Sequence, residues 1–225
     1  MIKRICDWIL RKYYERYFNN KYPKEIIFYK GRFIKNFGMY DIDIRNFFTN
    51  PNVEELKKIV KDFNGSDDDK ALLCQKWIFN NIKYVPDKSQ VGLNEYWMYP
   101  SETLKTRKGD CDDGAILMAN LMVSSGIPYW KIRINAGNVF DRNNKLMGGH
   151  AYVTYYCEEK NKWVALDWCY YADTNVKIIN KPDYKLSILY GKGKVWFSFN
   201  KKYSFTKSNT DLKKLKGVKW LKIIK

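Results

Sequence analysis

The sequence predicts an α+β domain, with helices first along the chain and antiparallel strands after them. Segments with apolar residues at helical spacing dominate up to Ser125, and short segments rich in β-branched and aromatic residues dominate after it. The 225 residues are 45% hydrophobic and 17% aromatic, which is enough to bury a core. We find no internal repeat.

The expected helices follow from apolar spacing and from residues that favour helix ends. Ser66, with Asp69 three residues later, indicates a capping box at one helix start. Gly126 and Pro128 end the last helix. Residues 26–48 show no clear period and are left as strand or irregular structure. The helices are expected over residues 3–18, 53–63 and 67–82, over a short segment capped by Ser101 that ends near Gly109, and over residues 111–125.

The strands are expected from runs of Val, Ile, Tyr, Phe and Trp between turn residues. They span residues 130–136, 150–156, 163–168, 186–190 and 195–199. The last segment, residues 201–225, holds nine lysines and one acid, and its apolar residues fit either a helix or a strand from Val218 to Ile224. We expect an N-terminal helical extension over residues 1–65, the main domain over residues 66–200 and a basic C-terminal segment over residues 201–225.

The charge balance is strongly basic, with 41 Lys and Arg against 24 Asp and Glu and a formal net charge of +17. Such a surplus favours an anionic partner, although a solvated lysine-rich surface is the default interpretation. The five cysteines form no C-x-x-C and no disulfide pattern, and a single histidine excludes a Cys/His zinc motif. Without a signal-peptide core or an apolar run of membrane-spanning length, we expect a soluble intracellular protein.

Three residues carry the chemistry that the sequence suggests: Cys111, Asp167 and His150, which is the only histidine of the chain. Cys111 begins a predicted helix, where partial positive charge favours a thiolate and free N–H groups can receive an oxyanion. Three carboxylates close by in the sequence oppose thiolate formation, because negative charge raises a thiol pKa. They belong to Asp110, Asp112 and Asp113. We expect these carboxylates to point away from the sulfur; otherwise a protonated His150 must supply most of the activation.

The predicted hairpin register places His150 opposite Asp167. With a turn over Cys157 to Lys160, Tyr156 pairs with Asn161, and the same register pairs the histidine with the aspartate at a Cβ separation of about 5 Å. An aspartate there can hold one imidazole tautomer. Each residue also has a purely structural interpretation: Cys111 as a core thiol, His150 as a histidine with its hydrogen bonds made within the core, and Asp167 as a turn residue. Asp173 is the alternative to Asp167 as the third member of the set.

The segments Tyr96–Leu104, Gly109–Asp113, Gly149–Ala151 and Trp163–Asp167 resemble, in this order, the transglutaminase-like superfamily. The likeness covers about residues 71–170 and is strongest to the bacterial transglutaminase-like cysteine peptidases. It implies a papain-like fold in which the helix beginning at Cys111 packs on an antiparallel sheet.

The resemblance also implies roles for individual residues: Cys111 as nucleophile, His150 as general base and then acid, and Asp167 as the orienting group. The oxyanion would be received by the Cys111 backbone amide. The resemblance indicates no second donor, and Trp97 and Gln90 are candidates by their position and donor chemistry. Some relatives bind calcium near the nucleophile. Three adjacent acids at a helix start do not converge as ligands on their own, so we expect no required metal and no cofactor.

The leading functional hypothesis is a thiol-dependent acyl-transfer enzyme acting on a protein or peptide. Water as acceptor makes it a cysteine peptidase, which the resemblance favours, whereas an amine acceptor makes it a transglutaminase. A non-catalytic structural or binding component that retains the fold, for example in a virion, is the alternative, and the Lys- and Asn-rich composition suits an AT-rich genome such as a phage. A weaker hypothesis is a nucleic-acid binder that uses Trp8, Tyr13, Tyr14 and the basic C-terminal segment.

Overall fold

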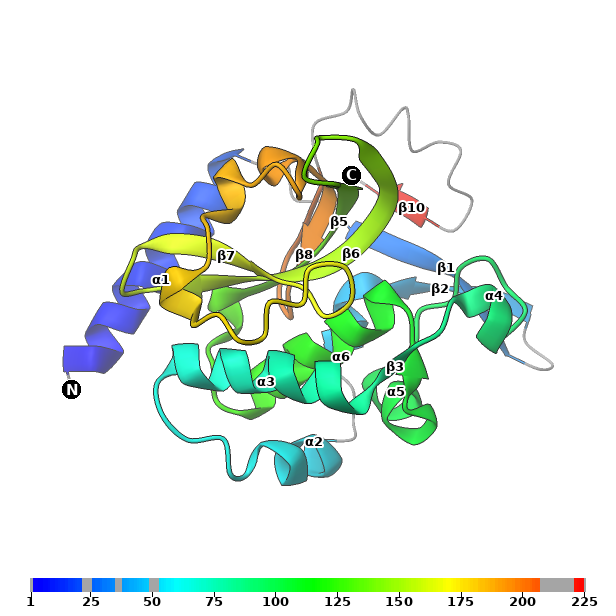
Figure 1. The fold of residues 1–225 in the computed structure, drawn as a ribbon, viewed down its shortest axis with the longest axis horizontal. Helices are drawn as coiled ribbons and strands as arrows, with labels where there is room; N and C mark the ends of the chain where they lie inside the picture. Colours follow the sequence, from blue (N-terminus) through cyan, green and yellow to red (C-terminus); the bar gives the residue numbers. More distant parts are fainter. Residues whose placement is uncertain (1, 22–25, 35–37, 49–52, 207–220, 225) are drawn as a thin grey trace.

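A five-stranded antiparallel sheet with the strand order β7-β6-β5-β8-β9 forms the centre of the protein (Figure 1). The computed structural model describes residues 2–21, 26–34, 38–48, 53–206 and 221–224. The strands of this sheet are β5 (Ile132–Phe140), β6 (Leu146–Cys157), β7 (Lys162–Leu166), β8 (Val195–Phe199) and β9 (Ser204–Thr206). This arrangement confirms the α+β class.

The helix α6 (Cys111–Ser124) lies under one face of the sheet. It is apolar on almost every side, as expected of a helix enclosed by its own domain. Asp110 and Asp113 form a capping box at its start. The helices α2 (Val53–Val60), α3 (Asp67–Asn81) and α5 (Pro100–Thr106) pack around it and complete the helical layer below the sheet.

The opposite face of the sheet is covered by α1 (Ile2–Lys21). Tyr14 of this helix packs in a cluster with Trp130, Tyr156 and Trp163. Because successive residues of a strand point to opposite faces, Tyr155 joins the core above α6 while Tyr156 meets α1.

The expectation that α1 packs its apolar stripe on the domain is only partly right. Leu10 and Tyr14 pack against the cluster on the sheet. The other large apolar residues of the described part of the helix form a second, exposed stripe of Ile5, Trp8, Ile9 and Tyr13. Among the described residues, no helix is both long and apolar enough to cross a membrane.

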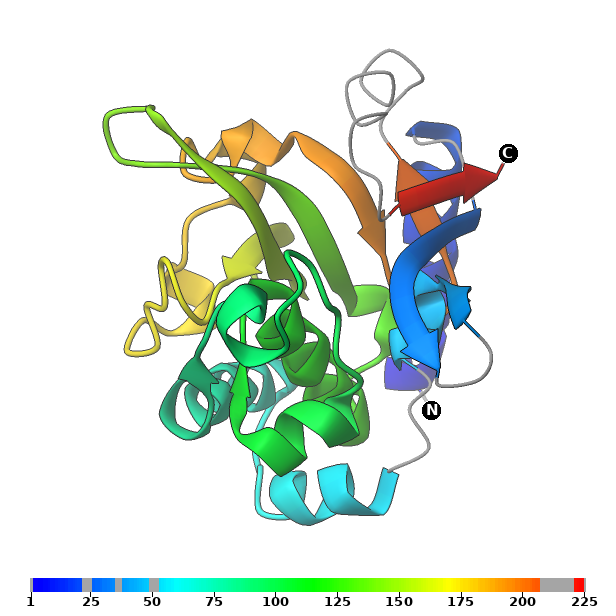
Figure 2. The same ribbon diagram turned by 90° about the vertical axis from the view of Figure 1, so that its right-hand side faces the viewer.

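Residues 26–48, which the sequence left as strand or irregular structure, contain two strands. After α1, β1 (Ile26–Ile34) and β2 (Gly38–Asp43) form a hairpin, followed by the 3-10 helix η1 (Ile44–Phe48). The C-terminal strand β10 (Leu221–Ile224) pairs with β1, so the two ends of the chain share a three-stranded sheet (Figure 2). This confirms the strand alternative for that end, whereas Leu212 and Leu215 lie outside the described residues.

Two local predictions are corrected by capping and turn chemistry. Tyr99, not Ser101, is the N-cap of α5, because Pro100 occupies the first helical position, where its fixed φ is favourable. Residues 186–190 form no strand. Instead, the Asp183 side chain accepts the Lys185 N–H and starts a 3-10 helix, η4 (Tyr184–Leu186), and a second, η5 (Gly191–Gly193), follows.

The β6–β7 register differs by two residues from the predicted one. Tyr156 pairs with Trp163 rather than with Asn161. Asn161 adopts a left-handed conformation with φ of 47° inside the turn, which an asparagine tolerates well, so the turn spans residues 158–161, one residue later than predicted. A shift of two residues keeps every side chain on its face of the sheet, so His150 and Asp167 still share a face although they are not directly paired.

Candidate active site

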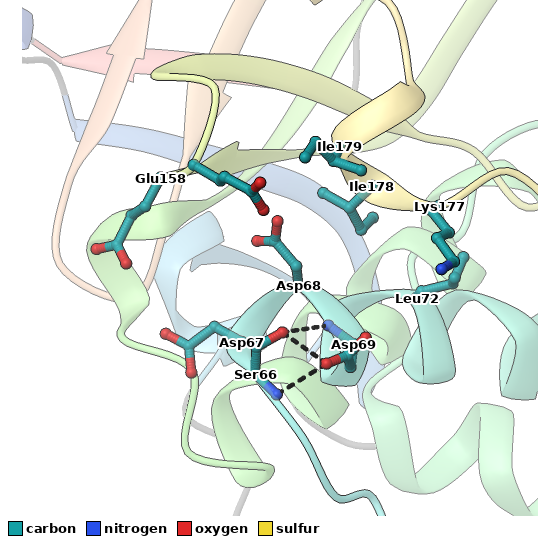
Figure 3. A pocket seen from close by; sticks show the side chains of 10 residues that line it. Ser66, Asp67, Asp68, Asp69, Leu72, Glu158, Lys177, Ile178 and Ile179 are labelled. Carbon is teal, nitrogen blue, oxygen red and sulfur yellow. Dashed lines mark hydrogen bonds between the residues drawn. The ribbon is translucent and has the colours of Figure 1, made fainter.

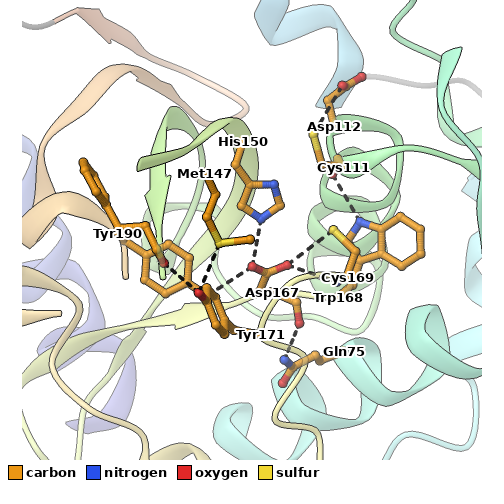
Figure 4. Close-up of polar contacts among 11 residues, drawn as sticks. Gln75, Cys111, Asp112, Met147, His150, Asp167, Trp168, Cys169, Tyr171 and Tyr190 are labelled. Carbon is orange, nitrogen blue, oxygen red and sulfur yellow. Dashed lines mark hydrogen bonds and ion pairs between the residues drawn. The ribbon is translucent and has the colours of Figure 1, made fainter. Parts of the chain in front are cut away.

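His150 on β6 and Asp167, directly after β7, form a buried pair. The His150 Nε2 lies 2.8 Å from the Asp167 Oδ2, and both side chains are fully buried (Figure 4). The Cys169 backbone N–H donates to Oδ1 at 3.1 Å, and the Tyr190 hydroxyl donates to Oδ2 at 3.2 Å. Burial acts to raise the pKa of Asp167, but the His150 charge and these hydrogen bonds outweigh it, so this pKa lies below its usual range.

The other imidazole nitrogen, His150 Nδ1, is buried and has no hydrogen-bond partner among the described residues. Figure 4 shows it on the side of the ring nearer Cys111. The backbone N–H of Ala151, the next residue of β6, donates to the Cys111 thiol, which places the nucleophile candidate beside this strand. The Tyr170 ring meets the imidazole edge-on with centroids 4.8 Å apart. The ring is therefore held by several contacts while one basic nitrogen stays open toward the thiol.

Cys111 is the first residue of α6 and is half-buried. The Trp168 indole N–H donates to its carbonyl oxygen at 3.2 Å, which ties the loop after β7 to the helix start. Burial and the Asp110 charge raise the pKa of the Cys111 thiol well above its usual value, while the Ala151 N–H lowers it. The helix start alone does not produce a thiolate here, so ionisation depends on a proton acceptor such as His150.

We expected the acids around Cys111 to point away from the sulfur, but not all of them do. The Asp112 Oδ1 lies 3.9 Å from Sγ, which contradicts the expectation for this residue. Asp113 points elsewhere, since its two oxygens accept the backbone N–H groups of Met98 and Asp110. The Asp110 charge, which raises the pKa of the thiol, also opposes a thiolate, so the thiol needs a further source of activation.

Replacing Asp110 by asparagine is expected to accelerate alkylation of Cys111. Asparagine caps a helix as well as aspartate does, so α6 keeps its start, but the charge that raises the thiol pKa is lost. We expect the iodoacetamide labelling rate at pH 7 to rise by about three- to tenfold, since lower nucleophilicity partly offsets the larger thiolate fraction. Asp183→Asn, at the cap of η4, is the matched control. An unchanged or slower rate would show that Asp110 does not set this pKa.

A fourth carboxylate joins the acids that the sequence singled out. Oxygens of Asp87, Asp110 and Asp113 lie within 4.8 Å of one another. Burial and the Asp110 charge raise the pKa of Asp87 to about 7, and the Asp87 Oδ1 is buried with no hydrogen-bond partner among the described residues. An oxygen-only set of this kind fits a hard divalent cation such as calcium. The sequence could not place Asp87 there because it is distant along the chain.

The two oxyanion candidates make other contacts. The Trp97 indole N–H donates to the Glu95 carboxylate at 2.7 Å, and its ring is buried against Tyr29. The Gln90 side-chain nitrogen lies 3.6 Å from the Met98 sulfur. Both assignments stay predictions that no contact among the described residues supports, and the Cys111 backbone amide remains the donor candidate at the helix start.

The fallback residue Asp173 is engaged elsewhere, because its carboxylate pairs with Lys181 at 2.5 Å. Several residues that fix the site escaped sequence reasoning. Gln75 on α3 donates to the Asp167 carbonyl at 2.6 Å, and Tyr190 lies in a segment expected only to supply a core strand. Their contacts span long stretches of sequence and carry no local motif.

A pocket of about 400 Å³ at the start of α3 is acidic but lies away from this site (Figure 3). Its three aspartates already have partners: Asp67 binds Lys131, Asp68 accepts the Tyr155 hydroxyl, and Asp69 completes the capping box with Ser66. Tyr155 is five residues beyond His150 along β6, which corresponds to about 17 Å. The aspartates of this pocket therefore stabilise the fold through these contacts, and none of them belongs to the site around Cys111.

A family model described as the transglutaminase-like superfamily matches residues 56–168, half of the chain. The chain belongs to the transglutaminase-like superfamily. The match spans all three members of the Cys111, His150 and Asp167 set and leaves out α1, the β1–β2 hairpin and β10.

Among curated proteins, the chain is 37% identical over 94 residues to the UPF0252 protein MJ1282 of Methanocaldococcus jannaschii. The match covers 38% of this chain and 26% of that protein, so this chain spans about a quarter of the relative's length.

Among solved structures, the chain is similar to EGTA-treated LapG from Legionella pneumophila, with 19% identity, 71% of this chain and 87% of LapG covered, and a TM-score of 0.46. It is also similar to a candidate cysteine protease from Cytophaga hutchinsonii, with 20% identity, 82% and 56% of the two chains covered, and a TM-score of 0.41. Both TM-scores lie below 0.5, so the family assignment rests on the family model.

Proposed function

We propose that this member of the superfamily is a thiol-dependent acyl-transfer enzyme that hydrolyses a peptide or amide bond through Cys111, His150 and Asp167. The observation that carries the proposal is the buried His150–Asp167 pair, whose Nδ1 has no partner among the described residues and lies on the side of the ring nearer Cys111. A histidine held on one nitrogen by a carboxylate, with the other nitrogen open, is the arrangement that general base catalysis needs.

In the proposed reaction, His150 takes the thiol proton and the Cys111 sulfur attacks the substrate carbonyl. The oxyanion that forms lies near the start of α6, where the Cys111 backbone amide can donate to it. His150 then gives the proton to the leaving amine, and water hydrolyses the acyl-enzyme with His150 again as base. An amine in place of water would turn the same acyl-enzyme into a transglutaminase reaction.

The Asp167 carboxylate orients the imidazole and stabilises its protonated form, which a raised thiol pKa makes necessary. The carboxylates of Asp87, Asp110 and Asp113 would hold a hard divalent cation if one binds, and the cation would supply charge compensation beside the thiol. No step of the proposed reaction depends on it.

The proposal is tested by alkylating the protein with iodoacetamide across pH and locating the label by mass spectrometry. We expect Cys111 to react faster at pH 7 than the exposed Cys6, and Cys111→Ser to lose this fast phase. His150→Ala is expected to slow labelling of Cys111 at pH 7 by about 10²- to 10⁴-fold. The labelling rate of this variant should recover only at alkaline pH. Cys6 provides the reference within each sample. Equal rates at Cys111 and Cys6 would leave the fold without the proposed chemistry.

A further inference from the structure

An apolar groove of about 500 Å³ lies beside the start of α6, because Trp168, which lines it, contacts the Cys111 carbonyl oxygen. It is formed by the end of α3, the short strand β3 (Lys83–Tyr84) and the loop after β7. The residues that line it are Phe79, Ile82, Tyr84, Trp168, Cys169 and Tyr170. None of these lining residues carries a charged side chain at neutral pH, although 29% of the residues in this chain are charged.

Three contacts connect the groove with the reacting groups. The Trp168 indole donates to the Cys111 carbonyl oxygen at 3.2 Å, and the Tyr170 ring meets the His150 ring with centroids 4.8 Å apart. The Tyr84 ring lies against the Trp168 ring at 5.9 Å, and the Cys111 charge contributes, after burial, to the raised pKa of Tyr84. These contacts place the groove beside both the start of α6 and the His150 ring.

The walls of the groove are aromatic rings that are left open to solvent. Phe79, Tyr84 and Tyr170 are 49%, 44% and 42% exposed, whereas Ile82 and Trp168 at the base are buried. Covering exposed aromatic surface is favourable, and rings on several sides suit a flat or branched apolar group better than a polar one. The chemistry of the groove therefore matches a large apolar side chain, since none of the lining side chains would form an ion pair with a charged one.

We propose that this groove is a substrate subsite for a bulky apolar side chain, such as that of Phe or Leu, at the acylated residue of the peptide or the residue beside it. The inference rests on the proposed thiol chemistry at Cys111 and adds the class of peptide that this site takes. The side chain would bury its apolar surface between Phe79, Tyr84 and Tyr170, while the peptide carbonyl lies at the start of α6.

The test uses peptidyl acyloxymethyl ketones that vary one residue among Phe, Leu, Ala, Glu and Lys at each of the two positions nearest the ketone. The Cys111 sulfur displaces the carboxylate leaving group from the methylene carbon, a thioether forms, and the thiol proton stays on His150. We expect the Phe or Leu probe to inactivate the protein at least about tenfold faster than the Ala probe at one of the two positions. Glu and Lys probes are expected to be the slowest.

The ratio of the Phe rate to the Ala rate, measured in each variant, isolates the groove from the thiol chemistry. Tyr84→Ala and Phe79→Ala are each expected to bring this ratio toward one, and Tyr84→Phe is expected to keep it. Leu186→Ala, at a residue that is 75% exposed and does not line the groove, is the control and keeps the wild-type ratio. Far-UV circular dichroism confirms that each variant is folded, and Phe79→Ala still tests the groove if Tyr84→Ala does not fold.

The outcomes separate the two proposals. If no probe labels Cys111 faster than Cys6, the proposed function fails. If the probes label Cys111 but the Phe and Ala rates are equal, or a charged probe is fastest, the thiol chemistry stands and the apolar subsite is wrong. If the ratio is high but the Tyr84 and Phe79 variants both leave it unchanged, the preference arises elsewhere and this groove is not its source.

Discussion

Replacing Asp167 by alanine is expected to be the most damaging single change in this protein. The substitution removes the acceptor of four hydrogen bonds, from His150, Tyr190 and both the backbone N–H and the thiol of Cys169, in a fully buried position. Each buried donor left without a partner costs about 1–3 kcal/mol, so the free energy of unfolding should fall by about 3 kcal/mol or more. Without the carboxylate to hold its tautomer, His150 should activate Cys111 about 10²- to 10⁴-fold less well. Urea unfolding and iodoacetamide labelling at pH 7 measure the two effects.

Asp167→Asn separates charge from shape at the same position. The amide oxygen can still accept from His150 and Tyr190, but its NH₂ group then faces the Cys169 backbone N–H, so one hydrogen bond is lost. We expect a smaller loss of stability, about 1–3 kcal/mol, and slower labelling because the charge that stabilises protonated His150 is absent. Asp173→Asn is the matched control in the same loop, because its carboxylate pairs with Lys181 and is 40% exposed. If Asp173→Asn, and not Asp167→Asn, slowed labelling, the third member would be misassigned.

The pH dependence of stability gives the same assignment an independent check. The folded-state pKa of Asp167 is lowered, so its ionised form stabilises the fold above the unfolded-state pKa, about 4 for aspartate. This contribution is lost as the pH falls from about 4 through the folded-state pKa. The stability difference between the wild type and Asp167→Asn should therefore shrink as the pH falls below about 4. A difference that grows as the pH falls below about 4 would contradict the lowered pKa.

Local signals made much of the helical layer predictable. Ser66 and Asp69 form the capping box that their spacing predicts, and α6 begins at Cys111 as its sequence indicates. Such features depend on residues that are close together along the chain, where backbone geometry fixes which groups meet. For the same reason the Val195–Phe199 strand was predicted with its observed bounds.

Features that depend on turns or on distant contacts were not predictable. The hairpin register moved by two residues because Asn161 takes a left-handed conformation, which periodicity cannot reveal. The Tyr190 hydroxyl reaches Asp167 only because two 3-10 helices replace the strand expected there. Gln75, 92 residues away from Asp167 in sequence, shows the same limitation. The candidate triad could be proposed from local motifs, but the side chains that contact its members could not.

Gly114→Ala tests whether the helix start and the loop after β7 are positioned as one unit. In the middle of a helix this change usually stabilises a protein, by about 0.5–1 kcal/mol. Here a Cβ on Gly114 would lie 2.2 Å from the Nε1 and Cε2 atoms of Trp168, so the indole must move. We expect the sign to reverse, with a loss of about 1–3 kcal/mol in the free energy of unfolding. Because the moving indole also gives up its bond to the Cys111 carbonyl, labelling of Cys111 should slow.

A double-mutant cycle with Trp168→Phe distinguishes this clash from a general disturbance of α6. Trp168→Phe alone removes the indole N–H and leaves a gap above the helix, so it should also destabilise the protein. The smaller ring gives space to the new methyl group. The double variant should therefore lose clearly less stability than the sum of the losses in the two single variants. Strict additivity would mean that Gly114 and Trp168 act independently. In that case the contact with the Trp168 indole would not be the reason for a glycine at position 114, one turn of α6 after Cys111.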